Sequence, residues 1–361
     1  MRLGLVIEGF WKDGVVYRSL EVESFIPWFA ENNDETYIIN LLEEPFEDDM
    51  VRVMDAKSGE LQRIPIGSLD VVYYGITGQK IHLPDGRLNS LAENLDLVLK
   101  SLETFSEYPG VKISNPPDTM LFGMSKDYLF KLSELDIPIV ETIDISSIAD
   151  LKSAIALGDD IVIKPKIAER GNGSVMSYEL RDEGAIREYA MRFLKPPISN
   201  TGSMMDNVMS RQGLIAQRFN PLFTTIGEKK IFYVNGKITV SRRNHPTLSF
   251  SQPSLDFRKG LVERIYEPTE DERRFVDKLA GSLENLGLDV DFFRADIVSD
   301  GTYDSIRLSE LELINPCSSS GHNPKNPATA NPTYPEEKVS EHNRALLNSF
   351  LLRAQLIEVR Q

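Results

Sequence analysis

Three carboxylates near the C-terminal end of the chain could act together on a cation. Asp296 lies in the apolar run FFRADIV, and Glu310 and Glu312 alternate with leucines in RLSELELI. Side chains two residues apart on a strand share a face, so Glu310 and Glu312 would point the same way. If the two runs pair as a hairpin, all three carboxylates converge and could hold a hard cation such as Mg²⁺. A solvated sheet face is the alternative.

Two lysines and a glycine-containing loop could contact phosphate. Lys164 ends the β-branched run DIVIK, and Gly171 and Gly173 follow in AERGNGS. Lysine suits phosphate as a point charge, and glycine lets backbone N–H groups approach phosphate oxygens. Lys126 stands at the start of a helical pattern with Ser125 as N-cap, where a bound anion would favour a cation. A surface lysine and a plain turn remain alternatives.

Further cations lie on or beside strand-like runs after residue 213, namely Lys230, Arg242, Arg243 and Arg258. They could bind phosphate and a substrate carboxylate, or lie on solvated faces. Strand alternation lets only one of Arg242 and Arg243 face a site. We expect Arg243, which would share a face with His245.

The elements that must position these residues change in character along the chain. Residues 1–118 alternate strand-like and helical patterns, and the breaker cluster SNPPD suggests a boundary. Residues 119–212 mix helices, strands and the glycine loop. From 213 onward strands dominate, with an Asn-Gly hairpin turn in VNGK and one long helix, EDERRFVDKLAGSLENLG. Residues 317–335 are low in complexity, and a final helix starts near 336.

Bulk composition narrows the class of partner. The chain has 361 residues, a net charge of −15 and one cysteine, Cys317. The acidic balance disfavours nucleic acid and anionic membranes as main partners. No apolar run reaches the roughly 18 residues of a membrane span, and no signal-peptide pattern opens the chain. One cysteine excludes an internal disulfide and fits a reducing cytoplasm, so we expect a cytoplasmic protein.

Taken in order, these features resemble the ATP-grasp superfamily over about residues 119–320. IAQRFNP, GEKKIFYVNGKI and LSELELINP are similar to three stretches of bacterial glutathione synthetases. Asp-Phe-Arg at 256–258 and ELELI at 310–314 are similar to amide-forming enzymes of D-cycloserine-type natural-product pathways. The order of the features is more specific than any one of them.

The resemblance implies an α/β (α+β) ATP-grasp fold. Its parts would be an N-terminal α/β substrate domain (1–118), a central subdomain (119–212) and a C-terminal subdomain (213–361), the last two gripping ATP. It implies an ATP-dependent carboxylate–amine ligase for small-peptide or natural-product biosynthesis, which makes an acyl phosphate and ADP before an amine displaces phosphate. The implied cofactors are ATP and two Mg²⁺ ions, with Mn²⁺ as a substitute.

The resemblance also assigns roles by position. Lys126, Lys164 and the loop with Gly171 and Gly173 would contact the ATP phosphates. Gln217, Arg218 and Phe219 would lie at the adenine, and Glu228 at the ribose. Asp296, Glu310 and Glu312 would hold Mg²⁺. Lys230, Arg243 and Arg258 would neutralise the transferring phosphoryl group or hold the acid.

The sequence departs from the glutathione synthetase pattern at three of these positions. Glu312 replaces Asn, which adds a negative charge to the metal shell, Glu228 replaces Asp, and Lys230 replaces Arg. Lysine lacks the bidentate fork of arginine.

Two other functions remain open. A kinase on the same fold would leave a stable phosphorylated product without an amine, and a nucleotide-binding protein would not turn over. The substrates would be a small acid and an amine, such as amino acids or peptides, which the sequence does not name. The final helix carries an apolar stripe that could pack within the chain or against a second copy in a homodimer, formed by Leu346, Leu347, Phe350 and Leu351.

Overall fold

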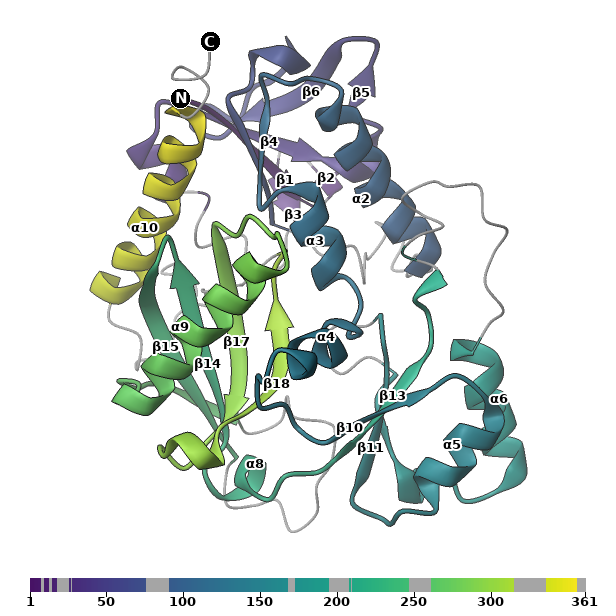
Figure 1. Cartoon of the computed structure of the whole chain (residues 1–361). Coiled ribbons are helices and arrows are strands. Elements are labelled where there is room, and N and C mark those ends of the chain that lie inside the picture. Colours follow the sequence, from purple (N-terminus) through teal and green to yellow (C-terminus); the bar gives the residue numbers. More distant parts are fainter. Residues whose placement is uncertain are drawn as a thin grey trace.

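The computed structural model describes residues 1–7, 10–12, 15–17, 26, 28–75, 91–167, 173–194, 208, 210–246, 261–314 and 336–355. Three larger sheets organise this part of the chain, each with helices packed on at least one face (Figure 1). Gly171 and Arg258 lie outside the described residues, so their predicted roles stay predictions.

A seven-stranded mixed sheet forms the N-terminal part, at the top of Figure 1. Its order is β5-β6-β4-β1-β8-β9, with β7 paired to β6, and β4, β1, β8 and β9 run parallel. Parallel strands are buried on both faces, as the apolar run of β1 requires. The strands are β1 (Arg2–Ile7), β4 (Glu35–Asn40), β5 (Phe46–Glu47), β6 (Met50–Asp55), β7 (Leu61–Pro65), β8 (Val71–Tyr74) and β9 (Lys112–Ser114), and a separate hairpin joins β2 (Phe10–Lys12) and β3 (Val15–Tyr17).

Two helices that are far apart in the sequence cover this sheet. α2 (Leu91–Ser106) packs on one face through Leu95, Val98 and Leu102. α10 (Glu336–Gln355) packs on the other through Leu346 and Phe350, together with residues of the C-terminal sheet. The apolar stripe of the final helix is therefore used within the chain.

A four-stranded sheet, β10-β13-β11-β12, forms the smaller unit at the lower right of Figure 1. One of its faces, with Ile163 and Ala216, packs on the helices α5 and α6. The opposite face, which carries Lys164, points away from these helices because strand side chains alternate. The elements are β10 (Thr142–Ile145), α5 (Ile148–Ile155), β11 (Ile161–Pro165), β12 (Val175–Met176), α6 (Glu183–Phe193) and β13 (Leu214–Arg218).

A five-stranded antiparallel sheet, β16-β15-β14-β17-β18, forms the C-terminal part. Apolar residues such as Ile231 and Ala295 pack against α9 on one face. The predicted Asn-Gly turn is confirmed, because Asn235 and Gly236 both have positive φ, 47° and 78°. The elements are β14 (Glu228–Val234), β15 (Lys237–Pro246), β16 (Leu261–Ile265), α9 (Glu270–Asn285), β17 (Phe292–Val298) and β18 (Arg307–Glu312).

The connection between the first and second parts differs from the prediction. The breaker cluster SNPPD opens a helix, α3 (Pro117–Gly123), because proline fits the first turn, where its missing N–H costs no bond. The next helix, α4 (Tyr128–Glu134), is capped at Asp127 rather than Ser125. Lys126 therefore lies in the turn between two helices. A short helix, α8 (Leu222–Thr225), and 3₁₀ turns at 41–43, 66–68, 177–179 and 303–305 complete the described elements.

Polar contacts fix the N-terminal sheet to the C-terminal sheet. Asn115, just after β9, donates to the carbonyls of Phe292 (2.8 Å) and Leu313 (2.7 Å). Asp291 accepts from Ser114 (2.5 Å) and pairs with Arg353 of α10 (2.5 Å). These buried bonds hold one end of β17 and the residues after β18 beside the N-terminal sheet. No helix of the described residues is long and apolar enough to cross a membrane.

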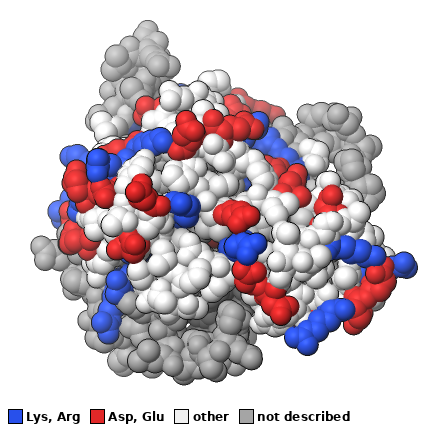
Figure 2. Space-filling model, turned by 60° about the horizontal axis from the view of Figure 1, so that its bottom comes forward, with Lys and Arg blue, Asp and Glu red and all other residues white. Residues whose placement is uncertain are grey.

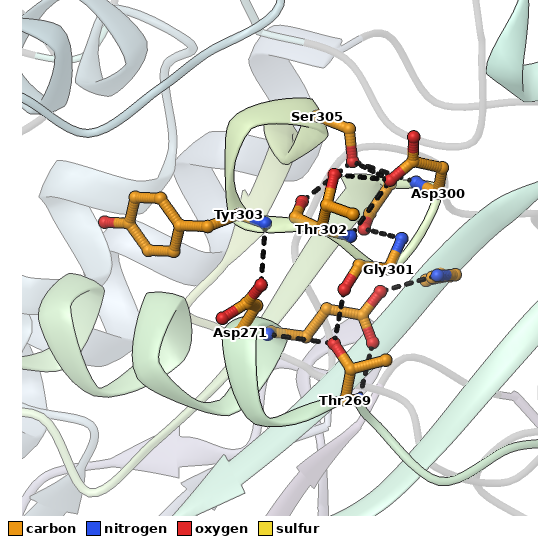
Figure 3. A network of polar contacts seen from close by, with 10 residues as sticks. Thr269, Asp271, Asp300, Gly301, Thr302, Tyr303 and Ser305 are labelled. Atoms are coloured by element: carbon orange, nitrogen blue, oxygen red, sulfur yellow. Dashed lines mark hydrogen bonds and ion pairs between the residues drawn. The ribbon is translucent and has the colours of Figure 1, made fainter.

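A polar network anchors the start of α9 (Figure 3). Thr269 and Glu272 form a capping box, and Thr269 also donates to the carbonyl of Gly301 (2.9 Å) in the turn between β17 and β18. Glu272 is fully buried, and its carboxylate is 2.5 Å from Nζ of Lys229 on β14. Helix, turn and central strand are thus joined on the back of the sheet.

Glu272→Gln should destabilise the protein by about 3 kcal/mol or more, because it leaves the buried Lys229 ammonium without its counter-charge. Urea unfolding followed by circular dichroism measures the loss. Glu270→Gln is the matched control: Glu270 is exposed in the same first turn, and its loss should cost less than about 1 kcal/mol. Equal effects of the two variants would contradict the role of the buried pair.

Candidate active site

The polar face of the C-terminal sheet carries two rows of functional side chains. Directly paired residues of antiparallel strands share a face. The first row across the strands is Arg242, Lys230, Asp296 and Glu310. The second row is Val240, Phe232, Arg294 and Glu312. The predicted hairpin of β17 and β18 is therefore confirmed, and its three carboxylates lie on one face.

Arg294 holds Asp296 on this face. Its Nε is 2.6 Å from Oδ1 and its Nη2 is 2.9 Å from Oδ2, a bidentate pair. Nζ of Lys230 is 3.6 Å from Oδ2 of the same carboxylate. Burial lowers the pKa of Arg294, but Asp296, Glu312 and Glu310 together raise it well above its ordinary value. The guanidinium is thus fixed as a charged group in the centre of the face.

Glu310 meets lysines from the neighbouring parts of the chain. Its Oε1 is 3.2 Å from Nζ of Lys126, which is itself buried. Burial would raise the pKa of Glu310, but the attraction of Lys126, Lys164 and Arg294 lowers it to about 2. The pKa of Lys164 is lowered by burial, in spite of the attraction of Glu310. The lysine of the small sheet and the carboxylate of the large sheet therefore act on each other across the space between them.

Glu228 belongs to the same group of charges. Burial and the nearby Asp296 raise the pKa of its carboxyl, while Lys230, 3.9 Å away, opposes the shift. Ser309 donates to Oε1 at 3.3 Å. Glu228 thus faces the carboxylates of β17 and β18 from one end of β14.

The contacts of Asp296, Glu310 and Glu312 can be compared with the expected Mg²⁺ site. Glu310 and Glu312 are partly exposed and are the oxygen donors that Mg²⁺ prefers, whereas Arg294 engages both oxygens of Asp296. Among the described residues, no three acidic, histidine or cysteine side chains are grouped closely enough to hold one metal ion. Arg294 holds Asp296 and Lys126 holds Glu310, so the shared metal site of Asp296, Glu310 and Glu312 stays a prediction.

The structure places Arg242, and not the expected Arg243, on the face with Lys230 and Asp296. Arg242 pairs with Lys230 and lies 5.0 Å above the ring of Phe232, so it faces the site and is buried. Arg243 pairs with Lys229, whose side chain reaches α9 on the opposite face. The sequence could exclude one arginine but not choose between them, since the register of β15 against β14 decides.

Two of the residues expected at the adenine, Gln217 and Arg218, lie on opposite faces of the small sheet because strand side chains alternate. Gln217 pairs with Val162 and shares the face of Lys164, and its amide donates to Thr142 at 3.0 Å. Arg218 is exposed and pairs with Glu141 (3.3 Å) and Asp160 (3.1 Å). Among these two, the structure brings only Gln217 to the face of the lysine.

Phe219 and Gly173 make structural contacts near the strands of the small sheet. The N–H of Phe219 donates to the carbonyl of Asp160 at 2.7 Å. Gly173 has φ +71°, and a Cβ there would lie 2.6 Å from Cζ of Phe193. Only glycine fits that position, so its conformation has a packing reason besides any contact with phosphate.

Arg294 lies on the charged face although sequence reasoning gave it no role, and Arg242 lies there although Arg243 was expected. An arginine two residues before a strand carboxylate is a usable signal, since side chains at this spacing share a face. On the molecular surface, acidic and basic side chains are interspersed over the face shown in Figure 2. Positive charge at the site therefore comes from a few buried cations within an acidic protein.

The depressed pKa of Glu310 predicts a pH dependence with a definite sign. The unfolded chain protonates this group near 4.5 and the folded chain near 2, so its contribution to stability is complete above pH 4.5 and is lost as the pH falls to about 2. Lys126→Met should raise the pKa of Glu310, as measured by NMR titration of ¹³C-labelled glutamate carboxylates. Lys131→Met, on the exposed side of α4, is the control. An unchanged pKa in Lys126→Met would contradict the pairing.

Comparison with known proteins rests on structure alone. No protein-family model and no curated protein matches the sequence. D-cycloserine synthetase DcsG is similar with a TM-score of 0.60 and 16% identity, over 97% of this chain and 100% of that chain. D-alanyl-alanine synthetase A from Vibrio cholerae O1 biovar eltor is similar with a TM-score of 0.57 and 14% identity, over 98% of both chains.

A third solved structure is the ATP-grasp ligase PsnB complexed with minimal precursor, Mg and ADP. It is similar with a TM-score of 0.52 and 13% identity, over 98% of this chain and 97% of that chain. These likenesses extend over nearly the whole chain, so the predicted fold is confirmed. The chain has the fold of the ATP-grasp ligases.

Proposed function

We propose that the protein is an ATP-dependent ligase that joins a carboxylate to an amine and releases ADP and phosphate. The observation that carries the proposal is the bridge between Lys126 and Glu310 beside Lys164. Cations from two parts of the chain converge there on a carboxylate of a third part. A triphosphate with its metal ion would satisfy both signs of charge in one place.

The remaining cations suit the reacting groups. In the proposed reaction an oxygen of the acid attacks the γ-phosphorus, and the bond from phosphorus to the oxygen of ADP breaks. The amine nitrogen then attacks the acyl carbon, the bond to phosphate oxygen breaks with its electron pair, and the amine loses a proton. Arg294, Arg242 and Lys230 line the face where negative charge develops in both steps, and such fixed charges stabilise transition states.

In this proposal, lysines bind the phosphates of ATP and carboxylates bind the metal ion. Lys126 and Lys164 would hold phosphate oxygens, and Glu310 and Glu312 would hold Mg²⁺, which usually binds one or two carboxylates plus substrate phosphates. Mg²⁺ would supply charge neutralisation on the transferring phosphoryl group. PsnB, a ligase with the same fold, has been solved with Mg and ADP, which supports this assignment.

The function is tested by ADP release in the presence of Mg²⁺, with the common L- and D-amino acids supplied as acids and as amines. We expect ADP rather than AMP, a requirement for both substrates, and trapping of the acyl phosphate by hydroxylamine. Glu312→Gln should lower the rate about 100-fold or more, by loss of a metal carboxylate. A stable phosphorylated product without an amine would indicate a kinase, and AMP would exclude the acyl-phosphate route.

Arg242 and Arg243 form a matched pair for the same assay. Arg242→Lys keeps the charge but loses the planar fork, so kcat/KM should fall about 10- to 100-fold. Arg243→Lys, on the opposite face, should change kcat/KM less than about threefold. Thermal melting checks that both variants fold. A larger loss in Arg243→Lys would overturn the assignment of the faces.

A further inference from the structure

The final helix places a buried histidine on the polar face of the C-terminal sheet. His342 of α10 is 1% exposed, and its ring meets the edge of Phe232 with centroids 5.5 Å apart. Phe232 is paired with Arg294 and lies under the guanidinium of Arg242. His342 therefore lies one row of side chains from Asp296. In Figure 1, α10 lies beside β15.

The hydrogen bonds of His342 define the free side of its ring. Nδ1 is 2.7 Å from Oγ1 of Thr239, and this hydroxyl is also 3.4 Å from the carbonyl of Phe232. A hydroxyl has one hydrogen to donate. Both contacts are satisfied only if Nδ1–H donates to Thr239 and the threonine donates to the carbonyl. Nε2 then carries an unprotonated lone pair.

That lone pair has no hydrogen-bond partner within the described part of the chain. Burial lowers the pKa of His342 to about 3, and the charge of Arg242 contributes to the shift, so the ring is neutral at physiological pH. A buried acceptor without a partner costs roughly 1–3 kcal/mol. Such a group in a native protein needs a reason, and a ligand that donates to it is one.

The next residue shows the same property. Asn343 is also 1% exposed, and neither its amide nitrogen nor its amide oxygen has a hydrogen-bond partner among the described residues. Consecutive helix residues point about 100° apart, so the two side chains cover adjacent sectors of α10. By contrast Ser349, further along α10, has a partner, Oδ1 of Asn235 at 3.1 Å. Both His342 and Asn343 lie in the N-terminal half of the helix, and of the two, His342 has the charge of Arg242 acting on its ring.

We propose that Nε2 of His342 accepts a hydrogen bond from the amine substrate and holds it beside Arg242 and Arg294. This assignment rests on the proposed ligase function and names the wall of the site that binds the second substrate. The attacking amine must be neutral, with a lone pair for the acyl carbon and an N–H to donate. A neutral imidazole accepts that N–H, while the guanidinium of Arg242 repels the protonated ammonium form.

The same contacts indicate where the phosphates of ATP and the amine would lie in the proposed site. Lys126, Lys164 and Glu310 mark the phosphate side, where the small sheet faces the large one. Arg242 and Arg294 follow along the strands, and α10 with His342 closes the far side against the N-terminal sheet. The amine would approach from that side, opposite the phosphate leaving group.

The test compares His342→Phe with Ser349→Ala, using the acid and amine pair that gives the fastest ADP release in the wild type. Phenylalanine keeps the ring packed against Phe232 and removes the acceptor. KM for the amine should rise at least about 10-fold, with KM for ATP changed less than about threefold. The melting temperature should be equal or higher, because an unsatisfied group is removed. Ser349→Ala should lower the melting temperature without a change in KM for the amine.

A second measurement reads the histidine directly. In protein labelled with ¹⁵N-histidine, Nε2 of His342 should give an unprotonated-type signal that moves when the amine is added. An unchanged KM for the amine, equal rises in all KM values, or an Nε2 signal that does not respond would overturn the role of His342 while leaving the ligase intact. A wild type that releases no ADP with any pair would instead overturn the proposed function, and this proposal with it.

Discussion

The site depends on the repulsion between carboxylates that one sheet face holds close together. Burial, together with the repulsion of Asp296 and Glu310, raises the pKa of Glu228. The fold compensates with cations from three separate places: Arg294 beside Asp296, Lys230 on the next strand, and Lys126 from the turn before α4. Because each cation arrives from a different element, the charges balance only when the parts of the chain are assembled.

The opposite face of the same sheet provides the rigidity that this balance needs. β14 and β17 alternate strictly, so every second residue packs against α9 while its neighbours carry the charges. The buried pair of Lys229 and Glu272 fixes the helix to the central strand, one residue from Lys230. Fixed charges stabilise a transition state better than mobile ones, since no reorganisation is needed during the reaction. The back of the sheet therefore holds the charged face in place.

The final helix contacts both the N-terminal and the C-terminal sheet. α10 fills the space between the N-terminal and C-terminal sheets, and its Arg353 pairs with Asp291 at the joint made by Ser114. The same helix brings His342 to the arginines of the site. A helix that is remote in sequence from the N-terminal sheet thus packs on that sheet and also contacts the charged face of the C-terminal sheet. Solved ligases with the same fold match nearly the full length of this chain.

The sequence by itself determined the elements and their periodic patterns. The hairpin of β17 and β18, the Asn-Gly turn, the long helix α9 and the shared face of Glu310 and Glu312 follow from local rules of alternation and turn chemistry. Only the tertiary structure decided how strands register and which cation meets which carboxylate. The register of β15 turned Arg242, not Arg243, to the site, and Lys126 reached Glu310 across 184 positions of sequence. Such pairings depend on packing between distant elements, and a local pattern carries no information about them.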